Sequence, residues 1–282
     1  MTSVVFGLAT ALIWGVTSLT GARASRLLGA GPTLAWVSIL GLMLVGPFAV
    51  ADSRNGVDLA TLLWIALAGV ANVFGLLFGY AAVRRGKVGL AAPITSTEGA
   101  IAAVIAVIGG EAIAPLALAA MAIIVVGVIL ATLDFGAREV GGLAVTPTFL
   151  IFAIGAAICF GVGLYSGGRV SGDAPEAWIV VSARLAGTLV VAVPLVLARR
   201  LTMTRVALPW ILVTAVAEVL GYTAYVLGAR ESIATTAVLA SQFAALAVLG
   251  AYVFFRERLR RSQWLGVVLI CFGVAAVAAL SS

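Results

Sequence analysis

Long apolar runs follow one another along the whole chain, and short polar segments separate them. Almost all of the charged residues lie in these short segments. Each run has about the 20 residues that a helix needs to cross the hydrocarbon layer of a bilayer. The runs occupy residues 3–20, 32–50, 59–83, 88–109, 114–132, 147–167, 174–197, 208–229, 234–255 and 262–280. The pattern therefore predicts an all-α integral membrane protein with ten transmembrane helices.

The composition supports a lipid environment for these helices. Apolar residues make up 63% of the 282 residues and charged residues only 10%, whereas a soluble domain has about a quarter charged residues. The net charge of +6 would suggest nucleic acid as a partner of a soluble protein. In a membrane protein, the enrichment of Lys and Arg in cytoplasmic loops explains it better, so we expect the lipid bilayer and no nucleic acid as partner.

The basic residues are distributed unevenly between the two sets of loops. The loops after the odd-numbered runs hold 13 of the 17 Lys and Arg residues, and those after the even-numbered runs hold three. This bias places the loops after odd-numbered runs in the cytoplasm. Both termini are then predicted to be non-cytoplasmic. The protein is expected to be a multi-pass protein of the plasma membrane, which is the inner membrane in cells that have two membranes.

The chain also aligns with itself when it is shifted by 146 positions. Gly15 then meets Gly161 and Trp64 meets Trp210, with no gap between these pairs. Because each half contains five predicted spans, an odd number, the second half must cross the membrane in the opposite direction. Inverted repeats of this kind are common in secondary transporters, whose substrate sites lie near the midplane between the repeats. We expect a first five-helix repeat at 1–136, a connecting loop at 137–146 and a second repeat at 147–282.

Two local motifs resemble the EamA-type members of the drug/metabolite transporter superfamily. One is Trp14-Gly15 followed by small residues, and the other is the loop Phe255-Arg256-Glu257-Arg258-Leu259 before the last span. Ten spans in two five-helix repeats fit the same family. The resemblance covers essentially the whole chain. It implies that the first four helices of each repeat surround a central cavity and that the fifth is peripheral.

Three ionisable residues lie near the centres of predicted spans, namely Glu98, Arg184 and Glu218. A charge at this depth costs about 2.5–3.5 kcal/mol on insertion scales and therefore faces the bundle interior or a wet cavity. Asn72 occupies the position in the first repeat that Glu218 occupies in the second. We interpret the four as one midplane site, with Glu98 and Glu218 as candidates for proton coupling. Arg184 could bind a substrate carboxylate or form a buried ion pair with a glutamate, and Glu218 is the better candidate for that partner.

Other polar and aromatic residues at helical spacing extend this candidate site. The first span presents a polar and aromatic stripe, Tyr222 follows Glu218 on one helix face, and Thr95 shares a face with Glu98. Gln242 belongs to a polar pair in the middle of the ninth span. The full set of candidate substrate-binding residues is Trp14, Thr17, Ser18, Asn72, Thr95, Glu98, Arg184, Glu218, Tyr222 and Gln242. For the individual serines and threonines, hydrogen bonding to their own helix is the competing interpretation.

The charges of the site favour a substrate that carries an amine. Two carboxylates and one guanidinium suit cations, zwitterions or neutral solutes better than phosphates or dicarboxylates. We expect a secondary transporter, an exporter of amino acids or related small amine-bearing metabolites, that alternates access around a midplane cavity, with proton coupling as a candidate driving force. The alternatives are a uniporter or facilitator of neutral metabolites, and, less favoured, a cationic-drug efflux protein or a channel.

Several other classes of function fit the sequence poorly. The chain contains no histidine, which excludes histidine-based metal sites and a Ser-His-Asp triad, and the short loops offer few candidates for catalysis. We therefore expect no enzymatic activity, no cofactor and no metal. A monomer is the expected state. The small-residue pairs Gly75-x-x-x-Gly79 and Gly163-x-x-x-Gly167 suit close helix packing within the chain, and a homodimer is the alternative use of such pairs.

Overall fold

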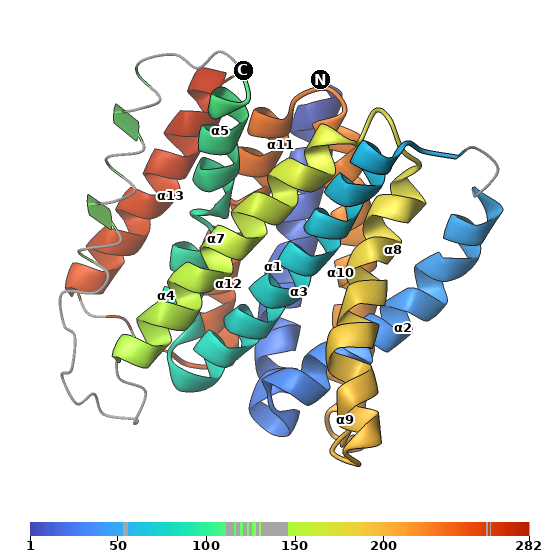
Figure 1. Cartoon of the computed structure of the whole chain (residues 1–282). Helices are drawn as coiled ribbons and strands as arrows, with labels where there is room; N and C mark the ends of the chain where they lie inside the picture. The colour runs from blue at the N-terminus through green and yellow to red at the C-terminus, as the bar shows by residue number, and fades with distance from the viewer. Residues whose placement is uncertain are drawn as a thin grey trace.

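A computed structural model describes residues 1–52, 56–110, 146–257 and 261–281, together with Leu259 and scattered positions between 116 and 130. These residues form an α-helical bundle (Figure 1). The described helices are α1 (Thr2–Leu28), α2 (Ala30–Ala51), α3 (Leu59–Arg85), α4 (Val88–Thr95), α5 (Glu98–Ile108), α7 (Pro147–Arg169), α8 (Glu176–Gly187), the π-helix η1 (Thr188–Ala192), α9 (Val193–Leu197), α10 (Leu208–Ala229), α11 (Ile233–Ala240), α12 (Phe243–Phe254) and α13 (Arg261–Ser281).

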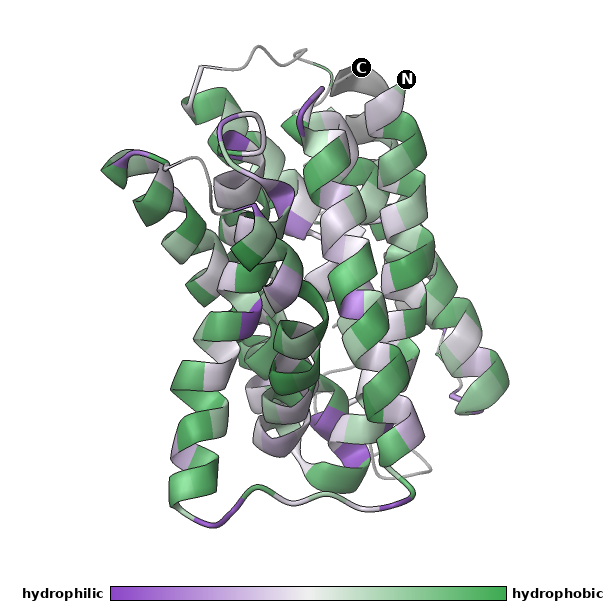
Figure 2. Cartoon of the chain, turned by 90° about the vertical axis from the view of Figure 1, so that its right-hand side faces the viewer, coloured by the Kyte–Doolittle hydropathy of each residue, from purple (hydrophilic) through white to green (hydrophobic). Residues whose placement is uncertain are grey.

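Eight helical segments in the described part of the chain are long and apolar enough to cross a membrane. They coincide with the predicted runs one to four and six to nine, and α13 occupies the tenth. Most of the fifth run, 114–132, and the connecting loop 137–146 apart from Thr146 lie outside the described residues. Apolar residues predominate along the helices, and hydrophilic residues gather mainly near the helix ends and in the loops (Figure 2). The molecule is thus a multi-pass membrane protein; the count of ten spans stays a prediction.

Two of the predicted spans are not continuous helices. The fourth run is broken at Ser96 and Thr97, between α4 and α5, and the ninth is broken at Ser241 and Gln242, between α11 and α12. At the first break the hydroxyls of Ser96 and Thr97 donate to the carbonyls of Pro93 and Ile94, both at 2.8 Å. Such side-chain bonds compete with helical hydrogen bonds. The 146-residue shift aligns Ser96 with Gln242, so the two breaks lie within one residue of equivalent positions.

The two broken spans pack directly against each other at their breaks. A Cβ atom on Gly99, in the first turn of α5, would lie 2.8 Å from the carbonyl oxygen of Ala237 in α11 and would collide with the Ser241 hydroxyl. The absence of a side chain at Gly99 therefore permits this close approach. Irregular backbone at membrane depth is tolerated where it is buried in protein, and broken helices in transporters typically border the substrate site.

The small-residue pairs of the sequence serve packing within the chain. Gly75 and Gly79 on α3 face the Phe160 ring of α7, and Gly163 on α7 faces the backbone of Asn72 on α3. These contacts bring α3 and α7 close together, as small residues do between membrane helices. A helix of the first predicted repeat, α3, therefore contacts a helix of the second, α7.

Candidate functional site

A cavity of about 100 Å³ lies inside the bundle, among helices of both predicted repeats. Its lining residues are Trp14, Thr17, Ser18, Ala22, Asn72, Leu76, Gly79, Tyr80, Val83, Val88, Ala91, Ala92, Thr95, Glu98, Phe160, Gly163, Leu164, Glu218, Tyr222 and Phe243. Eight of the ten predicted binding residues are among them. The two that are not are Arg184 and Gln242.

Glu98 brings a carboxylate to this cavity at the break between α4 and α5. It is the first residue of α5 and is only 3% exposed. No hydrogen bond or ion pair to its carboxylate is found among the described residues. The N-terminus of a helix favours negative charge because its first backbone N–H groups are unpaired. The side chain is therefore available to a ligand, and the cavity that it lines is also lined by the small residues Ala91 and Ala92 of α4.

Arg184 on α8 lies behind the cavity wall and does not line the cavity. Its side chain is completely buried, and its Nη2 donates to Glu218 Oε2 at 3.3 Å and to Asn72 Oδ1 at 3.5 Å. The ion pair with Glu218 that the sequence suggested is thus present. Asn72 and Glu218 do line the cavity, from α3 and α10. Arg184 therefore connects Glu218 and Asn72, which face the cavity, from a position behind the cavity wall.

The remaining polar candidates differ in what they can offer a ligand. The hydroxyls of Thr17 and Ser18 donate to the carbonyls of Ile13 and Trp14 on their own helix. Their oxygen atoms can therefore serve a ligand mainly as hydrogen-bond acceptors. Gln242 is half-buried at the start of α12, and its Nε2 has no hydrogen-bond partner among the described residues. Thus Thr17 and Ser18 can contribute acceptors, and the position of Gln242 outside the lining gives it no direct part in the cavity.

Aromatic rings form much of the rest of the cavity surface. Trp14 stacks on Tyr225 with ring centroids 6.2 Å apart and meets Phe243 edge-on at 6.3 Å. Tyr222 in turn stacks on Tyr225. Tyr225 is itself buried and donates its hydroxyl to the Leu164 carbonyl at 2.9 Å. This stacking fixes Trp14 and Tyr222 as rigid faces that can contact an apolar or cationic group.

The sequence analysis did not select three aromatic residues that the structure places on the cavity, Tyr80, Phe160 and Phe243. Phe160 was within reach, because it is the residue that the 146-position shift aligns with the selected Trp14. Tyr80 and Phe243 offered no comparable signal, since apolar and aromatic residues occur throughout these spans.

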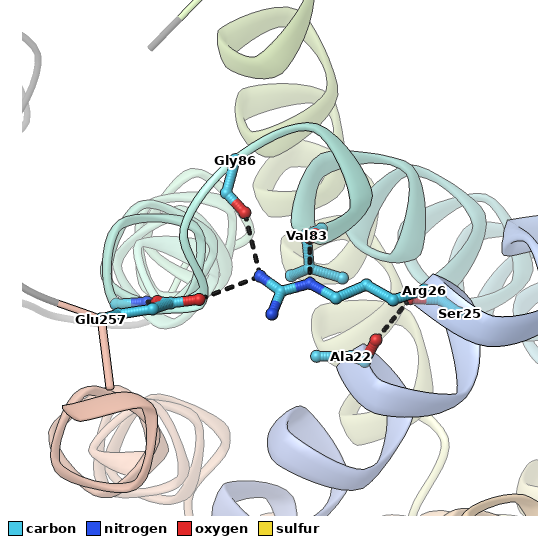
Figure 3. A network of polar contacts seen from close by, with 7 residues as sticks. Ala22, Ser25, Arg26, Val83, Gly86 and Glu257 are labelled. Carbon is cyan, nitrogen blue, oxygen red and sulfur yellow. Dashed lines mark hydrogen bonds and ion pairs between the residues drawn. The ribbon is translucent and has the colours of Figure 1, made fainter. Parts of the chain in front are cut away.

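One end of the cavity, lined by Ala22, Val83 and Val88, points toward the end of the bundle that holds Arg26, which we call the basic end. Just beyond it, Arg26 Nη2 forms an ion pair with Glu257 Oε1 at 2.9 Å (Figure 3). Arg26 also donates to the carbonyls of Val83 and Gly86, at 3.1 and 3.2 Å.

Glu257 completes this network with its second oxygen. Its Oε2 accepts the backbone N–H of Gly89, in the first turn of α4, at 3.0 Å. The guanidinium of Arg26 also lies over the Phe255 ring, 5.0 Å from its centroid. The end of α1, the α3–α4 connection and the segment before α13 are therefore tied together where the cavity ends.

The EamA-like transporter family matches residues 1–133 and 148–279 of the chain. The protein belongs to this family. The resemblance that the sequence motifs suggested is thereby confirmed, and the chain is a membrane transporter. One solved crystal structure of a protein is similar to this chain, with a TM-score of 0.70 and 16% sequence identity. The alignment covers 99% of this chain and 98% of the other. At that identity the likeness shows a shared fold and nothing of the substrate. No curated protein matches the chain.

Proposed function

We propose that this EamA family member is a secondary transporter that exports amino acids or related small amine-bearing metabolites from the cell across the plasma membrane. Substrate binds in the cavity between the two repeats, which open alternately to either side. The chain is neither an enzyme nor dependent on a cofactor. The observation that supports the proposal most is the Glu98 carboxylate, which faces an aromatic cavity without a partner among the described residues.

The chemistry of the cavity suits a small amine. Glu98 can accept from an ammonium group, and the Trp14 and Tyr222 rings can contact its cationic part or an apolar side chain. Because Asn72 presents its carbonyl oxygen to Arg184, its amide N–H groups are left to donate to a substrate carboxylate. A volume of about 100 Å³ is well below the roughly 300–1,000 Å³ of pockets for drug-sized ligands, which favours a small metabolite over a large cationic drug.

We further propose that Glu98 couples transport to protons. Substrate and proton compete for one carboxylate, so that binding one displaces the other and a proton gradient drives substrate uphill. Glu218 is the less suitable proton carrier because Arg184 already neutralises it. A uniporter, in which Glu98 only binds substrate or has no role, is the alternative.

Transport in proteoliposomes tests both proposals. A panel of amino acids and amines is screened for counterflow and for accumulation driven by a pH gradient. If Glu98 is the proton carrier, Glu98→Gln should retain counterflow and lose pH-driven accumulation. Asp173→Asn also replaces a carboxylate by its amide, at an exposed loop position. It serves as the matched control and should behave as wild type.

Other outcomes point elsewhere. A parallel loss of both activities in Glu98→Gln would assign the carboxylate to substrate ammonium binding. Wild-type behaviour in Glu98→Gln with loss of accumulation in Glu218→Gln would exchange the two roles. Absence of pH-driven accumulation in the wild type would favour the uniporter, and a panel without any transported amine would contradict the proposed substrate class.

A further inference from the structure

Arg184 is placed to act on the cavity without touching its contents. It is completely buried and absent from the lining, yet its Nη2 bonds to two lining residues, Glu218 and Asn72. Its aliphatic stem crosses the backbone of Gly41 on α2, where a Cβ atom would come within 2.6 Å of the Arg184 Cδ. The space for this side chain is thus provided by the first repeat.

The local backbone of α8 also changes immediately after Arg184. The α-helix gives way to the π-helix η1 at Thr188, whose hydroxyl donates back to the Arg184 carbonyl at 2.8 Å. Pro194, at the start of α9, has no N–H and cannot continue an ordinary α-helical ladder, and a π-helical turn accommodates this irregularity. Arg184 therefore lies at the last regular turn before a distorted segment, with its carbonyl oxygen held.

The other two guanidinium nitrogens do not provide a second set of contacts. Nε and Nη1 are buried and have no hydrogen-bond partner among the described residues. All hydrogen bonds of this side chain that the structure describes are therefore directed at Glu218 and Asn72. Removing one partner of a buried ion pair leaves an uncompensated charge, which is strongly unfavourable.

The charge balance at the cavity follows from this arrangement. Glu98 and Glu218 both line the cavity. Arg184 neutralises Glu218, so that two carboxylates present one unneutralised negative charge. Without Arg184, the same cavity would hold two carboxyl groups and no Lys or Arg partner among its lining residues.

We propose that Arg184 is a positioning residue that sets the charge class of the substrate: by holding Glu218 and Asn72 from behind the wall, it restricts the cavity to solutes with a single ammonium group. The inference rests on the proposed recognition of amines by Glu98. It replaces direct contact between Arg184 and a substrate carboxylate with an indirect effect through Glu218.

Binding of two probes with the same four-carbon chain, n-butylamine and 1,4-diaminobutane, tests this inference. Titrations of the purified full-length protein follow the fluorescence of Trp14, and a Trp14→Phe variant identifies the contribution of that residue. The wild type should prefer the monoamine. Arg184→Met should shift the ratio of the two affinities at least about tenfold toward the diamine, because a second carboxylate then faces the cavity. Arg184→Lys keeps the positive charge and should keep most of the wild-type ratio.

The double variant Arg184→Met/Glu218→Gln makes the test independent of the stability of the single variant. It removes both members of the buried pair and leaves Glu98 as the one carboxylate, so that monoamine preference should return. The proposal requires that a neutral pair can substitute for the ion pair, so a double variant that does not bind the monoamine overturns it. A single variant that folds and keeps the wild-type ratio also overturns it.

The outcome for the wild type separates this inference from the proposed function. A wild type that binds the monoamine, with binding weakened by Glu98→Gln, supports amine recognition whatever Arg184 does. A wild type that binds neither probe nor any amino acid of the panel contradicts the proposed function and, with it, the role of Arg184.

Discussion

The guanidinium of Arg26 and the carboxylate of Glu257 lie 2.9 Å apart, although 231 residues separate them in the chain. Their contact joins the end of α1 to the segment that leads into α13, just beyond the end of the cavity lined by Ala22 and Val83. Glu257 is 7% exposed in its side chain and Arg26 24%. The pair is thus a largely buried connection between the two predicted repeats at the basic end of the bundle.

Removing this carboxylate should destabilise the protein. Glu257→Ala leaves the Gly89 N–H without its partner and removes the ion pair of Arg26, which keeps only its bonds to the carbonyls of Val83 and Gly86. A hydrogen bond to a charged group contributes about 1.5–3 kcal/mol. We expect a lower midpoint of thermal unfolding in detergent, equivalent to about 2 kcal/mol. Glu176→Ala provides the control, because its ion pair with Arg230 is more exposed and such pairs contribute only about 0–1 kcal/mol. Equal effects of the two substitutions would contradict the special role of the Arg26 contact.

The same contact should restrict access to the cavity. In a background without Cys159 and Cys271, a cysteine that replaces Ser18 places a thiol on the cavity lining. We expect Glu257→Ala to increase its labelling several-fold by a membrane-impermeant thiol reagent applied at the basic end. An unchanged labelling rate would show that the cavity opens by another route.

The orientation in the membrane can be tested across one span. Asp173 and Arg200 are both exposed and lie before α8 and after α9. In the same cysteine-free background, Asp173→Cys should react from outside intact cells and Arg200→Cys only from the cytoplasmic side. The reverse pattern would invert the topology that the distribution of basic residues predicts, and reaction of both from one side would contradict the span itself.

The crossing of the two broken spans should tolerate no side chain at Gly99. In Gly99→Ala the new methyl group would meet the Ala237 carbonyl and the Ser241 hydroxyl, and overpacking of this kind typically costs about 1–3 kcal/mol. We expect a lower unfolding midpoint and reduced transport. Gly172→Ala is the control, because nothing lies within 4 Å of the added Cβ there. A fully stable and active Gly99→Ala variant would show that the crossing can separate at no cost.

The sequence alone determined the features that depend on composition along the chain. The apolar runs defined the spans because a helix in lipid must be apolar over a fixed length, and the family was visible in two short motifs. Glu98, Glu218 and Asn72 could be selected because an ionisable or polar group in mid-membrane must face the protein interior. Eight of the selected residues do line one cavity.

Only the tertiary structure decided what each of these side chains faces. Arg184 is as central in its span as Glu98, yet it lies behind the wall, because its direction depends on the rotation of α8 against α2, α3 and α10. The two breaks fall at the polar clusters Thr95-Ser96-Thr97-Glu98 and Ser241-Gln242, but the hydropathy of each run as a whole predicted one continuous span. The contact between Arg26 and Glu257 likewise joins the last turn of α1 to the segment before α13, which no local pattern connects. Hydropathy fixes how deep a residue lies, whereas the packing of small residues such as Gly41 and Gly99 fixes its partners.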